Sequence, residues 1–176
     1  MGMIKPLNYS IVVLLKRFFT KDYKRGAKMI ERFTLDNIIS EFSCYANIER
    51  LLKNIECTGI NKEKYNEIWI YPKNLYNCIN DRVNEKEIHF YFINNGNFYD
   101  LYFNKEDSYK VNMSCIKLNQ IKRFNVEQNI DKNDITLSII FKDDKIVTMS
   151  KNSESTGFRI TEMYIDSIKE IIKKLS

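Results

Sequence analysis

The sequence predicts an α+β fold, in which a bent antiparallel meander of about six or seven strands is preceded by one amphipathic helix and closed by another. Two observations lead to this prediction. At about residues 34–55 and 161–174, apolar residues recur every three or four positions, as they do on one face of a helix. Between about residues 87 and 150 they recur at every second position, which is the period of a strand.

The first helix is expected over about residues 34–55, where Thr34 or Asp36 can cap its start. Its apolar stripe comprises Ile38, Phe42, Tyr45, Ile48, Leu52 and Ile55. A polar loop at residues 61–64 and a short strand at residues 67–71 should follow. Pro72 should end that strand, because proline cannot donate a hydrogen bond to a strand ladder.

The meander begins with a hairpin around Asn95-Gly96, a dipeptide typical of two-residue turns. This turn predicts three pairs on one face, Phe92 with Tyr99, Phe90 with Leu101 and Ile88 with Phe103, and three on the other, Ile93 with Phe98, Tyr91 with Asp100 and His89 with Tyr102. The first face is wholly apolar and should point to the core. The first helix is the candidate to cover the second face.

Four more strands are expected, at residues 109–116, 121–127, 135–141 and 146–150. A three-residue turn at residues 143–145 would pair Phe141 with Val147, Ile139 with Met149, Ile140 with Thr148 and Ser138 with Ser150. Thr161 is the expected cap of the closing helix. The apolar stripe of that helix comprises Tyr164, Ile168, Ile171, Ile172 and Leu175.

The charge of the chain is concentrated in residues 1–28, which hold seven basic residues and one aspartate. The whole chain carries a net charge of +5, so residues 29–176 are close to neutral. The apolar run at residues 11–15 is too short for a secretory signal or a membrane span. One interpretation is a basic amphipathic helix that would contact an anionic surface through Lys16, Arg17, Lys21, Lys24 and Arg25.

The favoured interpretation is that residues 1–28 are translated upstream DNA. Residues 25–29 can be encoded by AGA-GGA-GCA-AAA-ATG, which contains a purine-rich ribosome-binding sequence ahead of a start codon. We therefore expect Met29 to be the native start. Residues 1–28 would then lie outside the native domain or be disordered, and residues 29–176 would form a single α+β domain.

Cysteine and histidine usage argues against a metal site or a disulfide framework. Cys44, Cys57, Cys78 and Cys115 are widely spaced and His89 is the only histidine, so no zinc-binding spacing is present. The sequence contains no phosphate-binding glycine loop and no nucleophile motif, and no cofactor is expected. Reduced thiols without a signal peptide predict a cytoplasmic protein.

Element order and apolar pattern resemble the pleckstrin-homology-like domains of small bacterial proteins. The resemblance covers about residues 87–175, and its best stretches are residues 118–124 (LNQIKRF) and 135–147 (ITLSIIFKDDKIV). It implies that the last helix closes one open end of a bent sheet. Members that bind phosphoinositides use basic residues around an early strand–strand loop, but residues 94–97 (NNGN) contain none. The resemblance therefore does not extend to headgroup binding.

The candidate site residues are His89, Tyr91, Phe98 and Tyr102, which share one predicted sheet face. If no helix covers them, they form a partner surface; if one does, they belong to the core. His89 would be the general base if the protein were an enzyme, but a lone histidine on a strand is more often a surface or half-buried residue. Residues 122–124 (KRF) combine two basic residues with an aromatic one, as nucleic-acid binders do. In a domain near neutrality they are interpreted as a solvated strand face, and no nucleic-acid partner is expected.

These observations predict a non-enzymatic protein-interaction module of bacterial, cytoplasmic type. The alternative is a peripheral membrane module that binds anionic lipid through residues 1–28. The sequence leaves the partner and the oligomeric state open.

Overall fold

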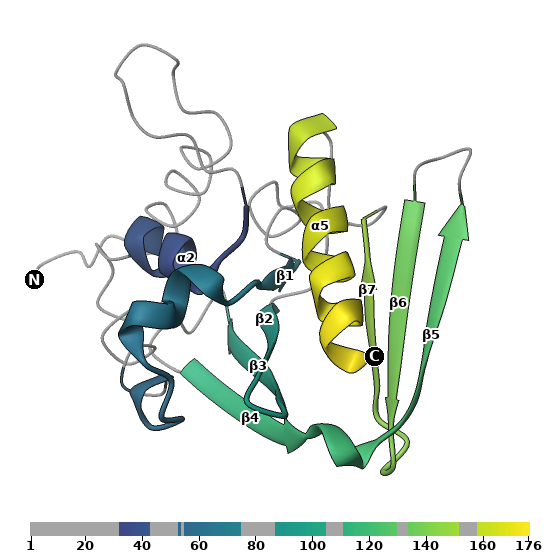
Figure 1. Ribbon diagram of the computed structural model, residues 1–176, viewed down its shortest axis with the longest axis horizontal. Coiled ribbons are helices and arrows are strands. Elements are labelled where there is room, and N and C mark those ends of the chain that lie inside the picture. The colour runs from purple at the N-terminus through teal and green to yellow at the C-terminus, as the bar shows by residue number, and fades with distance from the viewer. Residues whose placement is uncertain are drawn as a thin grey trace, which may run out of the picture.

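The computed structural model describes residues 32–42, 53, 55–74, 87–104, 111–129, 134–151 and 158–176. In this part of the chain, seven antiparallel strands form two sheets that pack with a C-terminal helix, so the α+β prediction is confirmed. The first sheet has the strand order β1-β2-β3-β4 and the second has the order β5-β6-β7. The C-terminal helix α5 lies between the two sheets (Figure 1).

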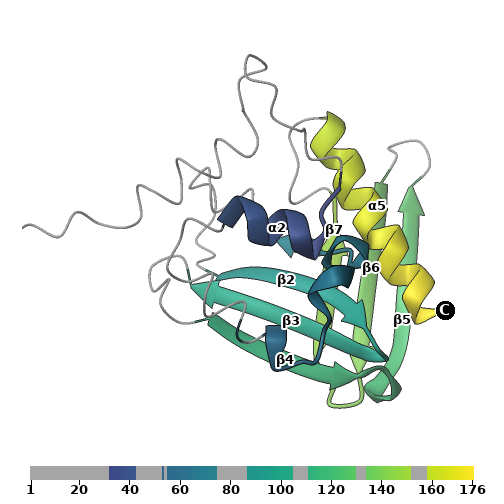
Figure 2. The same ribbon diagram turned by 60° about the vertical axis from the view of Figure 1, so that its left-hand side comes forward.

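The first sheet consists of β1 (Tyr71–Lys73), β2 (Glu87–Asn94), β3 (Asn97–Asn104) and β4 (Val111–Lys117). The second consists of β5 (Ile121–Asn129), β6 (Asp134–Phe141) and β7 (Ile146–Ser150). The helices are α2 (Leu35–Phe42), the short 3-10 helices η1 (Lys62–Glu67) and η2 (Leu118–Gln120), and α5 (Phe158–Leu175). The strands of the second sheet run across the direction of β2, β3 and β4 (Figure 2).

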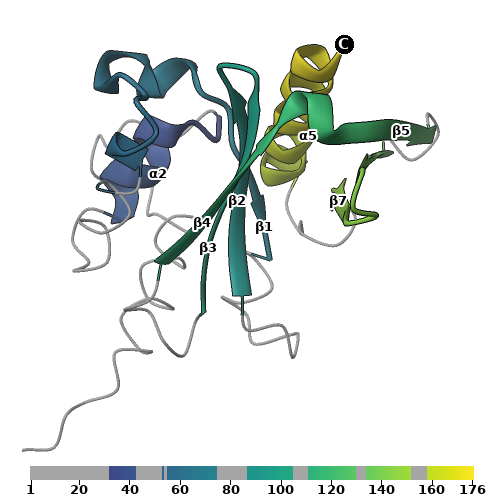
Figure 3. The ribbon, with the colours of Figure 1, turned by 90° about the horizontal axis from the view of Figure 1, so that it is seen from below.

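The two central strands of the first sheet, β2 and β3, are buried on both faces. Figure 3 shows α2 and η1 on one side of it, and α5 and the second sheet on the other. Phe98 is fully buried, and its ring lies 5.5 Å from that of Phe141 on β6, so the face that carries Phe98 is turned toward the second sheet. Strand alternation then turns Phe90 and Phe92 toward α2 and η1. The first helix was the candidate to cover the Phe98 face, but its described part, α2, lies on the opposite side, and α5 and the second sheet cover the Phe98 face.

The first hairpin has the predicted register in full. All six expected pairs are present, from Ile88 opposite Phe103 to Ile93 opposite Phe98. Asn95 (φ 48°) and Gly96 (φ 71°) both have positive φ angles, as a two-residue turn of type I′ requires. The local chemistry of this dipeptide is therefore sufficient to set the pairing of β2 with β3.

The second hairpin is shifted from its predicted register. Val147 lies opposite Ile139 and Met149 opposite Leu137, two residues from the expected partners. Asp144 adopts the left-handed conformation (φ 63°), and its N–H donates to the Phe141 carbonyl at 3.0 Å, so the turn begins one residue earlier than expected. Because a shift of two residues keeps every side chain on its face, β6 and β7 still bury the predicted positions.

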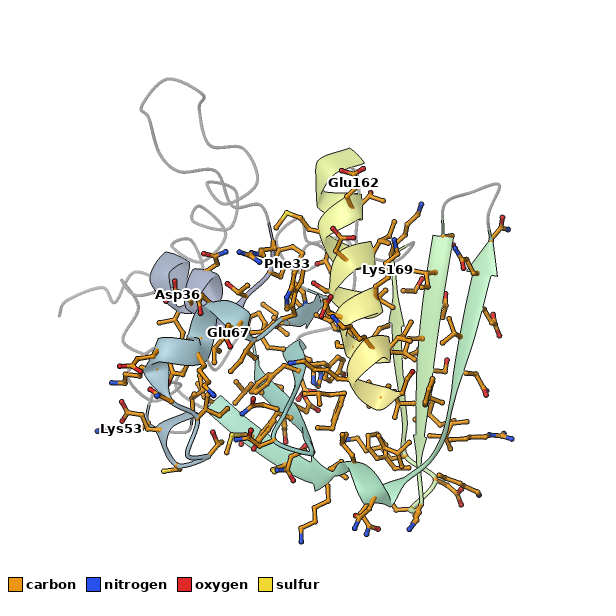
Figure 4. All side chains as sticks on the ribbon, viewed as in Figure 1. Phe33, Asp36, Lys53, Glu67, Glu162 and Lys169 are labelled. Carbon is orange, nitrogen blue, oxygen red and sulfur yellow. The ribbon has the colours of Figure 1, made fainter. Side chains whose placement is uncertain are left out.

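The start of the first helix is confirmed. The hydroxyl of Thr34 accepts a hydrogen bond from the N–H of Asn37 at 3.3 Å, and α2 begins at Leu35. The expected continuation to residue 55 falls mainly on residues 43–52, which lie outside the described residues. Phe33 lies between α2 and α5 (Figure 4), and its ring packs edge-on against Tyr164 at 5.1 Å.

The strand expected at residues 67–71 is wrong. η1 extends to Glu67, Trp69 makes a single bridge to Thr34, and β1 begins only at Tyr71. The expected loop at residues 61–64 is instead the start of η1, which the side chain of Asn61 caps. Pro72 lies within β1 and does not end it, because β1 is an edge strand and tolerates a residue without an N–H.

The closing helix begins at Phe158, so Thr161 lies within its first turn and is not its cap. The predicted apolar stripe is confirmed: Tyr164, Ile168 and Ile171 are buried, and Ile172 and Leu175 pack against the core. Near the helix end, the Lys174 ammonium donates to the Ile93 carbonyl at 3.0 Å, and partial burial lowers its pKa. None of the helices in the described part of the chain combines the length and the apolar character needed to cross a membrane.

Candidate functional site

His89 lies in a polar cluster on the face of the first sheet that is turned toward α5 and the second sheet. Its Nδ1 lies 2.8 Å from Oδ1 of Asp100, whose side chain is only 5% exposed. Its ring stacks at 5.3 Å on that of Tyr102 and lies 5.5 Å from that of Tyr91. We call His89, Tyr91, Asp100 and Tyr102 the His89 cluster. These are the neighbours that the predicted register brings together, since residues diagonal across a strand pair are within reach of long side chains.

The contacts of His89 fix its orientation. An ionised Asp100 can only accept, so Nδ1 donates to it and a neutral ring keeps its lone pair on Nε2. Nε2 lies 3.7 Å from a Glu87 carboxylate oxygen, and Lys145 approaches the second oxygen of Asp100 at 3.9 Å. The imidazole therefore lies between two carboxylates of its own sheet, which hold the orientation of its ring.

Of the four residues of the predicted partner surface, two are buried and two are partly exposed. Tyr91 is 3% exposed and stacks on Tyr71, and Phe98 is fully buried against Phe141. These two side chains are core, which removes them from any surface that a partner could reach in this fold. His89 and Tyr102 remain partly exposed at the rim of the same face.

Two further expectations concern residues beyond this face. The basic residues Lys16, Arg17, Lys21, Lys24 and Arg25 lie outside the described residues, as does the whole of 1–28. Within the described ranges, no three histidine, cysteine or acidic side chains are grouped so that they could hold a metal ion.

A second candidate site is the free edge of β5, which the sequence did not reveal. β5 pairs with β6 along one side, and no strand of the described chain pairs with its other side. We call this side the β5 edge. It is nine residues long, and all of its side chains except Ile121 and Phe124 are exposed.

The side chains of β5 alternate between two surfaces. Phe124 and Val126 lie opposite the buried residues Ile139 and Leu137 of β6, so they belong to the inner face of the second sheet. Val126 is nevertheless 43% exposed, because the packing of α5 and the first sheet does not cover it. The inner face of β5 is therefore an apolar strip that the described fold leaves partly open.

The outer face of β5 carries charge. Arg123 lies opposite Ile140, and Glu127 opposite Thr136, both on the solvent side of β6. Within the described residues, neither Arg123 nor Glu127 forms an ion pair. The alternation of apolar and charged residues at positions 123–127 was the available sequence signal, but alternation alone does not tell an edge strand from a central one.

At the edge of the second sheet opposite β5, hydrogen bonds connect β7 to β1 of the first sheet. The Tyr71 hydroxyl on β1 donates to the Ser150 carbonyl of β7 at 2.8 Å and accepts from the Ser150 N–H at 3.0 Å. These bonds join an edge strand of the first sheet to an edge strand of the second. β5 lies at the other end of the three-stranded order, and among the described strands it pairs with β6 alone.

Comparison with known proteins finds no matching family model, no matching curated protein and no matching solved structure.

Proposed function

We propose that this protein is a non-enzymatic interaction module that binds its partner by accepting an extended strand along the β5 edge. The observation that carries the proposal is the combination of a nine-residue edge strand with a 43% exposed Val126 on its inner face. An open strand edge offers a row of backbone donors and acceptors, which an added strand can satisfy without any rearrangement of the sheet. Exposed apolar side chains beside such an edge supply specificity and buried area.

The arrangement of the elements supports the choice of this edge. A four-stranded and a three-stranded antiparallel sheet with a closing helix agree with the pleckstrin-homology-like resemblance, and we propose that the chain is a domain of this type. The loop at residues 94–97 has no basic residue, so an anionic headgroup finds no counter-charge there. Binding through a strand edge requires none.

The environment of His89 favours a structural role over a catalytic one. Its polar contacts are made to Asp100 and Glu87 and its ring stacks on Tyr102, all within its own sheet, so its side chain is held by neighbouring strand residues. Exposed free thiols at Cys57 and Cys115 fit a reducing environment, and we propose a cytoplasmic location for this reason.

A peptide selection tests the proposed function. We would screen a random peptide display library against the full chain and measure the affinity of enriched peptides by calorimetry. The bound peptides should shift the backbone amide signals of residues 121–129 in NMR spectra. Val126→Lys, which places a charge on the apolar strip, should weaken binding at least about tenfold.

The matched control is Thr148→Lys, a similar change at an exposed position on the outer face of the same sheet. It should leave peptide affinity unchanged. Enriched peptides that bind Val126→Lys as tightly as the wild type, or a library that yields no binder, would overturn the proposal.

The membrane alternative stays open because residues 1–28 carry a net charge of +6. Co-sedimentation with vesicles of phosphatidylserine and phosphatidylcholine separates it from strand addition. Binding that disappears when residues 1–28 are deleted, and that persists in Val126→Lys, would favour the membrane alternative.

A further inference from the structure

We propose that the strand accepted by β5 is β5 of a second copy of this chain. The two strands would run antiparallel, with Asn125 opposite Asn125 of the second copy, and would join two three-stranded sheets into one continuous sheet. This inference rests on the proposed function, since both use the β5 edge. It names the partner, which the proposed function leaves open.

The register follows from symmetry and charge. In an antiparallel pair, opposite residues have the same hydrogen-bonding role, so a two-fold symmetric pair of identical strands is centred on one residue that faces itself. Centring on Asn125 places Arg123 opposite Glu127 of the second copy, twice in the dimer. Centring on Phe124 or Val126 places neither charge opposite its counterpart.

The charged residues are available for this pairing. Arg123 and Glu127 share the outer face of the second sheet, as their partners Ile140 and Thr136 on β6 show. Both are exposed, and neither forms an ion pair with another described residue. Opposite charges directly across a strand pair stabilise it, and like charges destabilise it.

The same register matches the apolar side chains. Phe124 comes to lie opposite Val126 of the second copy, again twice, on the inner face of the joined sheet. Val126 is one of the two large apolar side chains in the described residues that are highly exposed, and this contact would cover it. Apolar contacts on one face and ion pairs on the other thus favour one register.

The association closes at two copies. Each β5 contributes its one free edge to the pair, so the contact is isologous and leaves no unpaired edge of the second sheet at the junction. At the far side of that sheet, β7 is linked to Tyr71 of the first sheet at Ser150. Pairing of β5 with itself therefore predicts a dimer and not a filament.

Charge reversal provides a test that only this register passes. The full-length wild type should show concentration-dependent dimerisation in sedimentation equilibrium. Arg123→Glu would set two pairs of carboxylates opposite each other, and Glu127→Arg two pairs of guanidinium groups, so each variant alone should dimerise about tenfold more weakly or worse. An equimolar mixture of the two variants should recover the dimer, because every pair across the strands is again of opposite sign.

The controls separate this outcome from misfolding and from general charge effects. Lys53→Glu changes charge by the same amount at an exposed position far from β5 (Figure 4) and should dimerise as the wild type does. Recovery in the mixture requires both single variants to be folded, so it excludes unfolding as the cause of their weak association. The double variant Arg123→Glu with Glu127→Arg should also dimerise.

Two results would overturn the inference. One is a wild type that stays monomeric at about millimolar concentration; the other is a mixture that associates no better than the separate variants. If either result is found while selected peptides still bind at β5, strand addition stands and self-pairing fails. If the peptides fail as well, both the inference and the proposed function fall.

Discussion

The hydroxyl of Tyr71 makes two hydrogen bonds with the backbone of a single residue, Ser150, 79 positions later in the chain. One bond is donated to the carbonyl and one is accepted from the N–H. β1 and β7 belong to different sheets. The Tyr71 side chain therefore joins the two strands by hydrogen bonds, as backbone groups do between paired strands of one sheet. The ring of Tyr71 is also buried against Tyr91 and Tyr164, which fixes the direction of the hydroxyl.

Tyr71→Phe removes the hydroxyl and leaves the ring. We expect the free energy of unfolding to fall by about 1–3 kcal/mol, because the two hydrogen bonds between the hydroxyl and the backbone of Ser150 are lost. Urea unfolding measures the change. Tyr102→Phe is the matched control on the same sheet face and should change stability by less than about 0.5 kcal/mol. Equal effects of the two substitutions would contradict the link between the sheets.

Burial of both faces of β2 and β3 predicts that large-to-small substitutions on either face cost a similar free energy of unfolding. Phe90→Ala and Phe98→Ala change opposite faces, and both should cost about 3–5 kcal/mol because both side chains are fully buried. Tyr102→Ala, at the partly exposed rim, should cost clearly less. Thermal and urea unfolding of the three variants measures this. A mild effect at Phe98 would mean that α5 and the second sheet do not pack on that face.

His89 and Asp100 should be coupled energetically. His89→Ala leaves a buried carboxylate with Lys145 at 3.9 Å as its remaining ion-pair partner, and it should cost about 1–3 kcal/mol. In the Asp100→Ala background the same substitution should cost less, with a coupling free energy of about 0.5–3 kcal/mol. A double-mutant cycle measured by urea unfolding gives this quantity. Additive effects would show that the 2.8 Å contact contributes nothing to stability.

Tyr99 should make stability sensitive to high pH. Its burial, and then the neighbouring Cys115 thiol, raise the pKa of its hydroxyl above the ordinary 10.0. The folded protein therefore keeps this proton to a higher pH than the unfolded chain does. The stability that Tyr99 contributes is fully present below about pH 10 and is lost as the pH rises through its folded pKa.

We expect the free energy of unfolding of the wild type to fall more steeply above about pH 10 than that of Tyr99→Phe. Chemical unfolding at several pH values from about 8 to 11 measures the difference. Burial also raises the pKa of Tyr65. Tyr65→Phe should therefore independently reduce the fall of the unfolding free energy with pH. If the unfolding free energies of the wild type and Tyr99→Phe change in parallel with pH, the raised pKa of Tyr99 is contradicted.

The two hairpins show where local sequence is sufficient and where it is not. Asn95-Gly96 supplies two residues that accept positive φ angles, so one turn type is strongly preferred and the register of β2 with β3 follows. The second turn has no glycine. Residues 142–145 offer several positions for the left-handed residue, and the structure places it at Asp144, which shifts the pairing by two residues.

The His89 cluster was predictable for the same reason that the first hairpin was. Once the register placed His89 opposite Tyr102 and Tyr91 opposite Asp100, the diagonal contact between His89 and Asp100 followed from strand geometry. The sequence did not predict which element buries Tyr91. Both faces of β2 and β3 are rich in apolar residues, so their alternation does not show which helix or sheet packs on each face.

The sequence by itself determined the α+β class, most of the strand positions and the pairing of β2 with β3, because period, turn residues and caps act over a few neighbouring positions. Only the tertiary structure decided that α5 and the second sheet cover the face of Tyr91 and Phe98, that Tyr71 joins the two sheets, and that β5 keeps a free edge. These relations depend on which distant surfaces meet when the core closes. Apolar burial drives that closure without direction, so no local pattern can specify its outcome.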